Sequence, residues 1–503
     1  MPSGGDTLPL REPGGIVREP GGIVPPTEAS MEGQLPGTQP IEGAQPSCCV
    51  ILAAGERPPE ARWLPAAYVG RPWPLIRILG LSLAERTVAT AQAAGLDRFV
   101  VVLGPSPEEV RTLYQRIALR RGCSIEFVEA PDWQRGSGVM LSAARTRVAA
   151  SPFLLARGDH LITPGLLARL LETRLVPGEL RLAVDRDRAA LPDPERARKV
   201  GLAGDRVTRI GPEVRWWSAA EAGAMLCPRD LFAALDAAAA EGECALSDGV
   251  RRLVDAGSVS AVNVAGEPWA DVATPTGLRV ARMRLLAWLA RGRNDGFVTA
   301  HLTQRLSLGL TSRLADRDVS PNHVTVASFL AALVGAGFLS AGEYVFSVFG
   351  ALLVLAAAVT EGCDGALARL THQVTARGAW LDTVLDRYAD MAVVLAVTVA
   401  EASSSGVAGG LRPWLGGTLA MTGFLFASYV TKEFALRHGR EYPNDVLNRL
   451  RRRDLRLFGI GCGALLGVGF EAMALLGAIS HLCAAGMLLR AWRRQGPFGY
   501  RAA

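Results

Sequence analysis

The sequence has few of the residues that build zinc sites or disulfide frameworks. Its 503 residues include eight cysteines and six histidines. No two cysteines have the CxxC spacing, and only Cys48 and Cys49 are adjacent. Because no histidine lies near the cysteines in a ligand pattern, we expect neither a zinc site nor a disulfide framework. The first residues contain no apolar run, so we expect no cleavable signal peptide.

A large excess of charge of either sign is also missing. The formal net charge is +6, and the excess lies in particular loops, which suits an anionic membrane surface or phosphorylated substrates. We therefore expect no nucleic-acid partner. By contrast, 49% of the residues are hydrophobic and the mean hydropathy is +0.21. We expect part of the chain to lie in a lipid bilayer.

Residues 1–46 are rich in proline, glycine and glutamate. They contain REPGGIV twice in tandem, at 11–17 and 18–24. Such a composition cannot bury a hydrophobic core, and a repeat architecture needs at least three repeats of longer period. We predict a disordered tail, with a mistaken start codon as the alternative.

Short apolar runs alternate with amphipathic helical patterns over residues 47–286. Examples are CCVILAAG at 48–55 and FVVVLG at 99–104. This alternation predicts an α/β, Rossmann-like domain with a mostly parallel sheet. A basic amphipathic segment follows at 287–320, and we expect it to lie along a membrane surface.

Five carboxylates interrupt the apolar remainder of the chain, between residues 361 and 390. On a helix, the spacing of Glu361 and Asp364, and that of Asp382 and Asp386, puts each pair on one face. Two facing pairs would repel each other without a cation, and hard oxygen ligands favour Mg²⁺, Mn²⁺ or Ca²⁺. We predict that these four carboxylates hold two divalent ions, Mg²⁺ or Mn²⁺. The alternative is a solvated loop between two membrane helices.

The same stretch resembles a family signature. Enzymes of the CDP-alcohol phosphatidyltransferase family carry DxxDGxxAR and, after a short spacer, GxxxDxxxD. Here the two runs read EGCDGALAR and GAWLDTVLD. They depart from the pattern only at Glu361, whose extra methylene bears on metal spacing and preference. In addition, residues 321–325 resemble the Pro-Asn-x-x-Thr that opens the first helix of that family.

This resemblance implies metal-dependent transfer of a phosphoalcohol from a CDP-alcohol to a hydroxyl acceptor, with release of CMP. It implies that Asp386 is the general base. It also implies that the nucleotide is bound by Asn322, Thr325, Gly365, Arg369 and Gly378.

Residues 47–286 resemble the sugar-phosphate nucleotidyltransferases, particularly the cytidylyltransferases that activate inositol phosphate. The resemblance is carried by LAAG at 52–55, GLSLAERTV at 80–88, GSGVML at 136–141, GDH at 158–160 and WADVATP at 269–275. It implies that Asp159 is a retained metal ligand of that domain.

The sequence differs from that family at three places whose charges would stabilise the leaving pyrophosphate. GERPPEARW replaces a glycine-rich phosphate loop, Trp73 stands where a lysine meets phosphate, and Ala273 replaces a second metal-binding aspartate. We therefore predict a nucleotidyltransferase fold with degenerate activity and a binding or scaffolding role. Compensation could come from Arg57 or Arg71 for the lysine, and from Asp271 for the lost ligand.

Six apolar stretches follow residue 320, each near the ~20 residues that a bilayer span requires. They lie at 324–340, 343–360, 379–400, 412–431, 456–470 and 472–490, so we predict an all-α transmembrane domain of six helices over 321–503. Basic residues gather at 432–456 and after residue 489, and the positive-inside rule makes both regions cytoplasmic. A multi-pass protein of the inner (cell) membrane follows, with its soluble domain and acidic motif in the cytoplasm.

RRRDLRLF at 451–458 resembles a run in fused archaeal and bacterial enzymes that make di-inositol phosphate phosphate. That resemblance implies a CDP-inositol donor and an inositol phosphate acceptor. The acceptor would be bound by the arginines of this basic region, namely Arg437, Arg452, Arg453 and Arg456. A purely topogenic positive loop is the alternative.

Two other functions stay open. One is a phospholipid synthase that uses CDP-diacylglycerol, and the other is a membrane-anchored nucleotide-binding protein without transfer activity. We further expect a homodimer.

Overall fold

The computed structural model describes residues 46–53, 71–104, 107–148, 152–172, 176–188, 191, 193–195, 197–273, 275–291, 304–406 and 410–495. The predicted disordered tail lies outside these residues except for its last position. The GERPPEARW segment, with Arg57, lies outside them as well.

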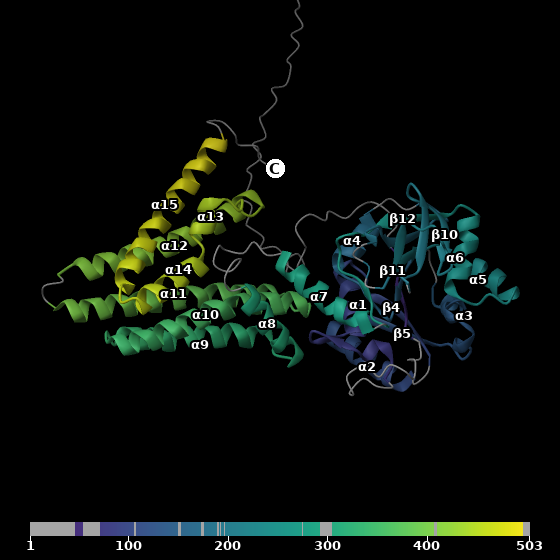
Figure 1. The fold of residues 1–503 in the computed structure, drawn as a ribbon, viewed down its shortest axis with the longest axis horizontal. Coiled ribbons are helices and arrows are strands. Elements are labelled where there is room, and N and C mark those ends of the chain that lie inside the picture. Colours follow the sequence, from purple (N-terminus) through teal and green to yellow (C-terminus); the bar gives the residue numbers. More distant parts are fainter. Residues whose placement is uncertain are drawn as a thin grey trace, which may run out of the picture. The chain divides into compact units, whose positions relative to one another are not determined.

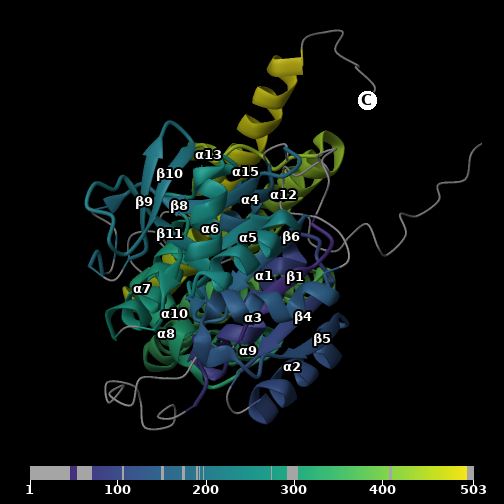
Figure 2. The same ribbon diagram turned by 90° about the vertical axis from the view of Figure 1, so that its right-hand side faces the viewer.

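Within the described residues, the first domain is built around a nine-stranded sheet in the order β5-β4-β1-β6-β11-β8-β12-β10-β9. Figure 2 shows the sheet running from β9 and β10 at one end to β5 at the other. The strands are β1 (Cys49–Leu52), β4 (Arg98–Leu103), β5 (Ser124–Glu129), β6 (Phe153–Arg157), β8 (Leu180–Asp185), β9 (Lys199–Ala203), β10 (Arg206–Gly211), β11 (Ala219–Cys227) and β12 (Val259–Asn263).

Strand direction divides this sheet into two halves. β5, β4, β1 and β6 pair in parallel, as the alternation of strands and helices predicted. In the other half, β11 runs antiparallel to β6 and β8, and β9 pairs antiparallel with β10 across a turn at Gly204, whose φ is 66°. The expectation of a mostly parallel sheet is therefore wrong for this half. Among its described strands, β8 and β12 pair in parallel, whereas the other pairings are antiparallel. A tight turn, such as that between β9 and β10, joins strands as antiparallel neighbours.

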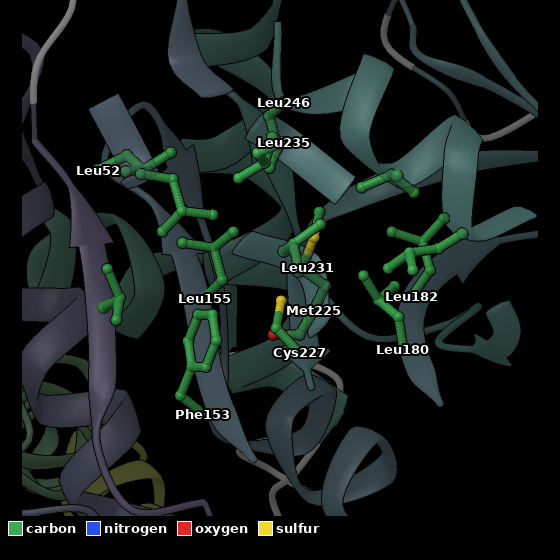
Figure 3. Close-up of a cluster of buried hydrophobic side chains, with 14 of the residues drawn as sticks. Leu52, Phe153, Leu155, Leu180, Leu182, Met225, Cys227, Leu231, Leu235 and Leu246 are labelled. Atoms are coloured by element: carbon green, nitrogen blue, oxygen red, sulfur yellow. The ribbon is translucent and has the colours of Figure 1, made fainter. Parts of the chain in front are cut away.

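Helices cover both faces of the sheet. One hydrophobic cluster includes residues of α3 (Ser137–Ala143), α5 (Asp230–Ala240) and α6 (Leu246–Asp255). The cluster on the other face includes residues of α1 (Leu83–Ala93), α2 (Pro107–Arg121) and α4 (Pro164–Glu172). Figure 3 shows part of the first cluster, in which side chains of β6, β8 and β11 pack with those of α5 and α6.

The alternation of side chains along β1 explains why two clusters form. Val50 and Leu52 belong to the first cluster, whereas Cys49 and Ile51 belong to the second. Successive residues of a strand point to opposite faces of a sheet. An uninterrupted apolar run is therefore typical of a strand that is buried on both sides.

Several further elements lie outside the nine-stranded sheet. They are the 3-10 turn η3 (Trp73–Leu75), the strands β2 (Arg77–Ile78), β3 (Leu81–Ser82), β7 (His160–Leu161) and β13 (Ala270–Asp271), and the helices α7 (Pro275–Arg291) and α8 (Gln304–Asp316). Helix α7 continues past the boundary expected at residue 286. Helix α8 forms part of the segment that was predicted to lie on a membrane surface.

Long helices make up the C-terminal part of the chain, and Figure 1 shows α9, α10 and α11 side by side. These helices are α9 (Pro321–Ser340), α10 (Tyr344–Leu370), α11 (Ala376–Ser405), α12 (Arg412–His438), the short α13 (Val446–Leu450), α14 (Arg453–Leu465) and α15 (Gly469–Gln495).

Among the described helices, α9, α10 and α15 are long and apolar enough to cross a membrane. The count of six spans stays a prediction. Helix α14 has 13 residues, which rise about 20 Å, whereas the hydrocarbon core of a bilayer is about 30 Å thick. The helix starts at residue 453, whereas the corresponding apolar stretch was expected to start at residue 456.

Ion pairs join several helix ends at one end of this helical bundle. Arg412, at the start of α12, lies 2.7 Å from Glu401 and 2.7 Å from Glu471. The hydroxyl of Tyr344 donates to the carbonyl oxygen of Leu465 at 3.0 Å. The end of α11 and the beginnings of α12 and α15 therefore meet, as an up-and-down arrangement of helices requires.

Close packing of α12 and α15 generates a prediction about stability. A Cβ on Gly477 would lie 2.6 Å from Cα of Ala420, so only glycine allows this approach of the two backbones. We expect Gly477→Val to lower the melting temperature of the detergent-solubilised protein, because overpacking costs about 1–3 kcal/mol. Gly337→Val in α9 is the control, since a Cβ there meets nothing within 4 Å. Equal melting of the two variants would contradict this packing.

Candidate functional site

The four carboxylates predicted to bind metal line one small pocket. Glu361 and Asp364 come from α10, and Asp382 and Asp386 come from α11. Their spacing of three or four residues places each pair on one face of its helix. The other residues that line the pocket are Thr325, Ser328, Phe329, Leu385, Ala389 and Arg453.

Asp364 is held in place by two short hydrogen bonds. The hydroxyl of Thr325 donates to one carboxylate oxygen at 2.6 Å, and the backbone N–H of Gly365 donates to the other at 2.6 Å. The carboxyl of Asp382 also lies within hydrogen-bonding reach of Asp364. Thr325, which was assigned to the nucleotide by resemblance, therefore also orients a carboxylate.

The remaining residues assigned to the nucleotide come from α9, α10 and α11. A Cβ on Gly378 would lie 3.2 Å from Oδ1 of Asn322 and 3.0 Å from Oγ1 of Thr375. The structure thus brings Gly378 and Asn322 together. Gly365 and Arg369 lie on α10, and a Cβ on Gly365 would lie 3.6 Å from Nη1 of Arg369.

Arg453, at the start of α14, lies among the carboxylates. Its Nη1 is 2.7 Å from Oε2 of Glu361 and 2.5 Å from Oδ1 of Asp386. Its Nε is 2.7 Å from Oδ1 of Asp390. The resemblance assigned this arginine to the acceptor. The structure gives it ion pairs that connect α14 to both acidic helices.

The other arginines assigned to the acceptor have different surroundings. Arg456 is 2% exposed, lies 3.4 Å from Asp390 and stacks over Phe424. Arg437 is exposed and pairs with Glu433 on its own helix at 2.6 Å. Arg452 is half-buried at the N-cap of α14. Of the four arginines predicted to bind the acceptor, Arg453 is the one found among the described residues that line the pocket.

Asp390 adjoins the pocket through its ion pair with Arg453, and the sequence pattern predicts no role for it. It is 5% exposed and pairs with Arg453, Arg456 and, at 3.2 Å, Arg387. The signal was present, because Asp390 continues the four-residue spacing of Asp382 and Asp386 along the same helical face.

The charges of this cluster do not balance. With every carboxylate ionised, the five from Glu361 to Asp390 face the three guanidinium groups of Arg387, Arg453 and Arg456, which leaves a formal excess of two negative charges. Among the described ion pairs, those of the three arginines involve Glu361, Asp386 and Asp390. Buried charge of one sign is costly, and carboxylate oxygens suit a hard divalent cation. The residues of the pocket therefore fit such an ion.

A second group of potential metal ligands lies in the soluble domain. Asp159, His160 and Asp271 each offer a ligand atom, and these atoms lie within 4.8 Å of one another. The pairing of β7 with β13 sets Asp271 opposite His160. Asp271 therefore lies close to Asp159, where it could replace the metal-binding aspartate that is missing at position 273.

An arginine occupies both oxygens of Asp159. Arg157 donates from Nε at 3.1 Å and from Nη2 at 2.8 Å, and Nδ1 of His160 lies 2.7 Å from the same carboxylate. Burial by itself raises the pKa of Asp159, but Arg157 and His160 outweigh it and hold this pKa well below its usual range. This ion pair supplies the compensating charge that a metal would otherwise provide.

Trp73, which stands at the expected lysine position, is 5% exposed and belongs to a hydrophobic cluster with Ile76 and Leu79. Arg71, the second candidate to replace that lysine, is exposed. The indole is thus part of a hydrophobic core.

Comparison with known proteins identifies the two parts of the chain. The sequence matches the family "CDP-alcohol phosphatidyltransferase" over residues 318–484 and the family "MobA-like NTP transferase domain" over residues 49–261. The protein is therefore a CDP-alcohol phosphotransferase. Its C-terminal phosphotransferase part consists of apolar helices, and its N-terminal part has a nucleotidyltransferase fold. This confirms the two-part organisation predicted from the sequence.

A protein of Rubrobacter xylanophilus described as "Bifunctional IPC transferase and DIPP synthase" is 36% identical over 414 residues, which are 82% of this chain and 90% of that protein. The chain belongs to the family of these bifunctional proteins.

Two further similarities each cover one part of the chain. An "Archaetidylinositol phosphate synthase" of Methanothermobacter thermautotrophicus is 29% identical over 184 residues, which are 36% of this chain and 88% of that protein. The solved structure of an inositol-1-phosphate CTP transferase from T. maritima covers 47% of this chain and 95% of its own, with 19% identity and a TM-score of 0.42.

Proposed function

We propose that this CDP-alcohol phosphotransferase uses CDP-inositol as donor and inositol phosphate as acceptor, and releases CMP. The observation that carries the proposal is the pocket in which two carboxylates of α10 face two carboxylates of α11. The description of the Rubrobacter relative as a DIPP synthase supports the choice of substrates.

Glu361, Asp364, Asp382 and Asp386 would hold two divalent ions, Mg²⁺ or Mn²⁺. When bound, such ions neutralise the diphosphate and the charge that develops on the leaving phosphate. The charge of the site supports two ions, because four positive charges would balance the two excess negative charges of the pocket and the two of the donor diphosphate.

The residues of the chain have distinct roles in the proposed reaction. Asp386 accepts the proton of the acceptor hydroxyl, whose oxygen forms a bond to the β-phosphorus while the bond from that phosphorus to CMP breaks. Arg453 holds Asp386 at 2.5 Å and Glu361 at 2.7 Å, which orients the base next to the metal ligands. Thr325 orients Asp364 in the same way.

Nucleotide and acceptor would approach this pocket from different sides. Asn322, Gly365, Arg369 and Gly378 would contact the CDP moiety, because the two glycines leave room for it. The phosphate of the acceptor would be bound by the basic region after α12, with Arg437, Arg452 and Arg456 as candidates beside Arg453.

A second candidate function is a phospholipid synthase that uses CDP-diacylglycerol. The observation that favours it is the match of the helical region to an archaetidylinositol phosphate synthase. For both functions we propose a homodimer in the inner (cell) membrane, with the active site and the soluble domain in the cytoplasm.

The carboxylate assignment predicts an absolute requirement for a divalent ion. We expect Asp364→Asn, Asp382→Asn and Asp386→Asn each to abolish CMP release from CDP-inositol and inositol phosphate, because each removes a ligand or the base. Glu361→Asp should retain activity, since it keeps the charge and restores the ligand of the family signature. The measurement is CMP release by protein in detergent, with and without Mg²⁺.

Two controls define the outcome. Variants must elute like wild type on size-exclusion chromatography, so that loss of activity is not loss of fold. Full activity of two of the three asparagine variants, or of wild type in excess chelator, would refute the metal site. CMP release from CDP-diacylglycerol but not from CDP-inositol would instead select the phospholipid synthase.

We also propose that the soluble domain does not make CDP-inositol at a useful rate. Trp73 is buried, and Arg157 engages both oxygens of Asp159, although Asp271 lies beside Asp159 and could replace the ligand lost at Ala273. Loss of one charge-stabilising contact costs about 10²–10³ in rate, so two independent losses cost on the order of 10⁴. The full chain, given CTP, inositol phosphate and Mg²⁺, should release no pyrophosphate above background. Release that disappears in Asp159→Asn would disprove this prediction.

The proposed orientation predicts accessibility from opposite sides of the membrane. Ser403, near the end of α11, should face away from the cytoplasm, whereas Arg440, just after α12, should face it. We expect a cysteine at position 403 to react with an impermeant maleimide in intact cells, and one at position 440 to react only in inverted vesicles. Wild type measures the background of the native cysteines, and labelling of position 440 in intact cells would overturn the orientation.

A further inference from the structure

Arg86 of α1 is a buried cation that has no role in the proposed chemistry. It belongs to the soluble domain and is 3% exposed. Its Nη1 donates to the carbonyl oxygen of Leu370 at 2.9 Å. Its Nη2 donates to the carbonyl oxygens of Ile78 at 2.6 Å and Leu79 at 3.3 Å. One guanidinium group therefore connects the β2–β3 hairpin to the last residue of α10.

The carbonyl group of Leu370 needs a partner from outside its helix. The last four carbonyl groups of an α-helix lack intrahelical donors. In the described turn after α10, the backbone N–H groups of residues 371–373 return to carbonyls of residues 367–369, so none of them serves Leu370. A cation at a helix C-terminus also interacts favourably with the helix dipole.

Arg86 keeps its charge in this position. Burial is the main effect on its pKa and lowers it to about 10, with Glu85 opposing this change and Arg121 adding to it. The group is therefore a cation at neutral pH. Burial and the charges of Arg86 and Arg121 lower the pKa of His372, in the turn after α10, to about 3, so this imidazole is neutral.

The contact is part of a larger packed region. Leu79 and Leu83 belong to the same hydrophobic cluster as Cys363 and Leu367 of α10. Helix α8 adds a polar contact, because the hydroxyl oxygen of Ser307 lies 3.4 Å from Sγ of Cys363. The segment of α10 that carries the acidic motif is thus held by the soluble domain and by α8.

We propose that Arg86 is a positioning residue for the phosphotransferase reaction, through which the soluble domain sets where the carboxylates of α10 stand relative to those of α11. Leu370 follows Asp364 by six residues, or about 9 Å along the helix axis, so a displacement of the helix end reaches the metal ligands. The inference rests on the proposed metal-dependent transfer. It gives the soluble domain a function that requires no nucleotidyl transfer.

The test compares Arg86→Gln, Arg86→Lys and wild type as full-length proteins in detergent. A misplacement of about 1 Å can cost 10²-fold in rate, and loss of a group that orients metal ligands costs about 10–100-fold in metal affinity. We expect Arg86→Gln to lower kcat by ~10–100-fold and to raise the Mg²⁺ concentration for half-maximal rate by ~10-fold. Arg86→Lys should lie between, because an ammonium group restores the charge without the fork that joins three carbonyls.

A matched control is Arg120→Gln in the same domain. Arg120 pairs with Glu85, the neighbour of Arg86, at 3.1 Å, and its side chain is 67% exposed. Loss of this pair should leave the Mg²⁺ requirement unchanged. Binding of Mn²⁺, followed by electron paramagnetic resonance, gives a second measurement that needs no substrate, with Asp364→Asn as the reference for loss of the site.

The outcomes separate this inference from the proposed function. If wild type releases no CMP from any CDP-alcohol tested, the proposed function fails, and Mn²⁺ binding still tests Arg86. If wild type is active, and Arg86→Gln has the same Mg²⁺ requirement and the same Mn²⁺ affinity as wild type, the positioning role is refuted. Should Arg86→Gln fail to fold, Arg86→Lys decides, and a Mg²⁺ requirement equal to that of wild type refutes the role.

Discussion

The excess of negative charge in one buried pocket is the constraint on which the helical domain depends. Four carboxylates line it, Asp390 adjoins it through Arg453, and three arginines compensate only part of their charge. Isolated buried charges cost several kcal/mol each, so the helices that carry them must supply partners. Helix α14 does this with Arg453, which contacts α10 and α11 together. Two divalent ions together with the donor diphosphate would carry two net positive charges, which would balance the two excess negative charges.

The two acidic sites of the chain deal with charge in opposite ways. In the soluble domain, Arg157 is two residues from Asp159 and engages both of its oxygens, so that site is compensated from within. In the helical domain, Arg387 comes from α11 itself, whereas Arg453 and Arg456 come from the distant helix α14, and the three together leave part of the negative charge unpaired. This contrast supports a soluble domain that contributes packing and position while the reaction occurs in the helical domain. The bond from Arg86 to the end of α10 is a direct path for that contribution.

Much of the pocket could be predicted from local sequence, because its four carboxylates come as two short-range pairs. Glu361 with Asp364, and Asp382 with Asp386, have spacings that fix their helical face. Asp390 continues this spacing and could have been included. The ion pairs of Arg453 could not be predicted, because they depend on where the start of α14 meets α10 and α11. The basic region looked uniform in sequence, yet its arginines divide into buried and exposed members.

The sequence by itself determined the local features of this protein: strands buried on both faces, apolar helices, and carboxylates at helical spacing. These follow from periodicity and side-chain chemistry within about ten residues. Only the tertiary structure decided the direction of β11, the closeness of Asp271 to Asp159, and the contact of Arg86 with Leu370. These depend on chain segments that are distant in sequence, and their contacts are set by the packing of whole elements, which no local pattern encodes.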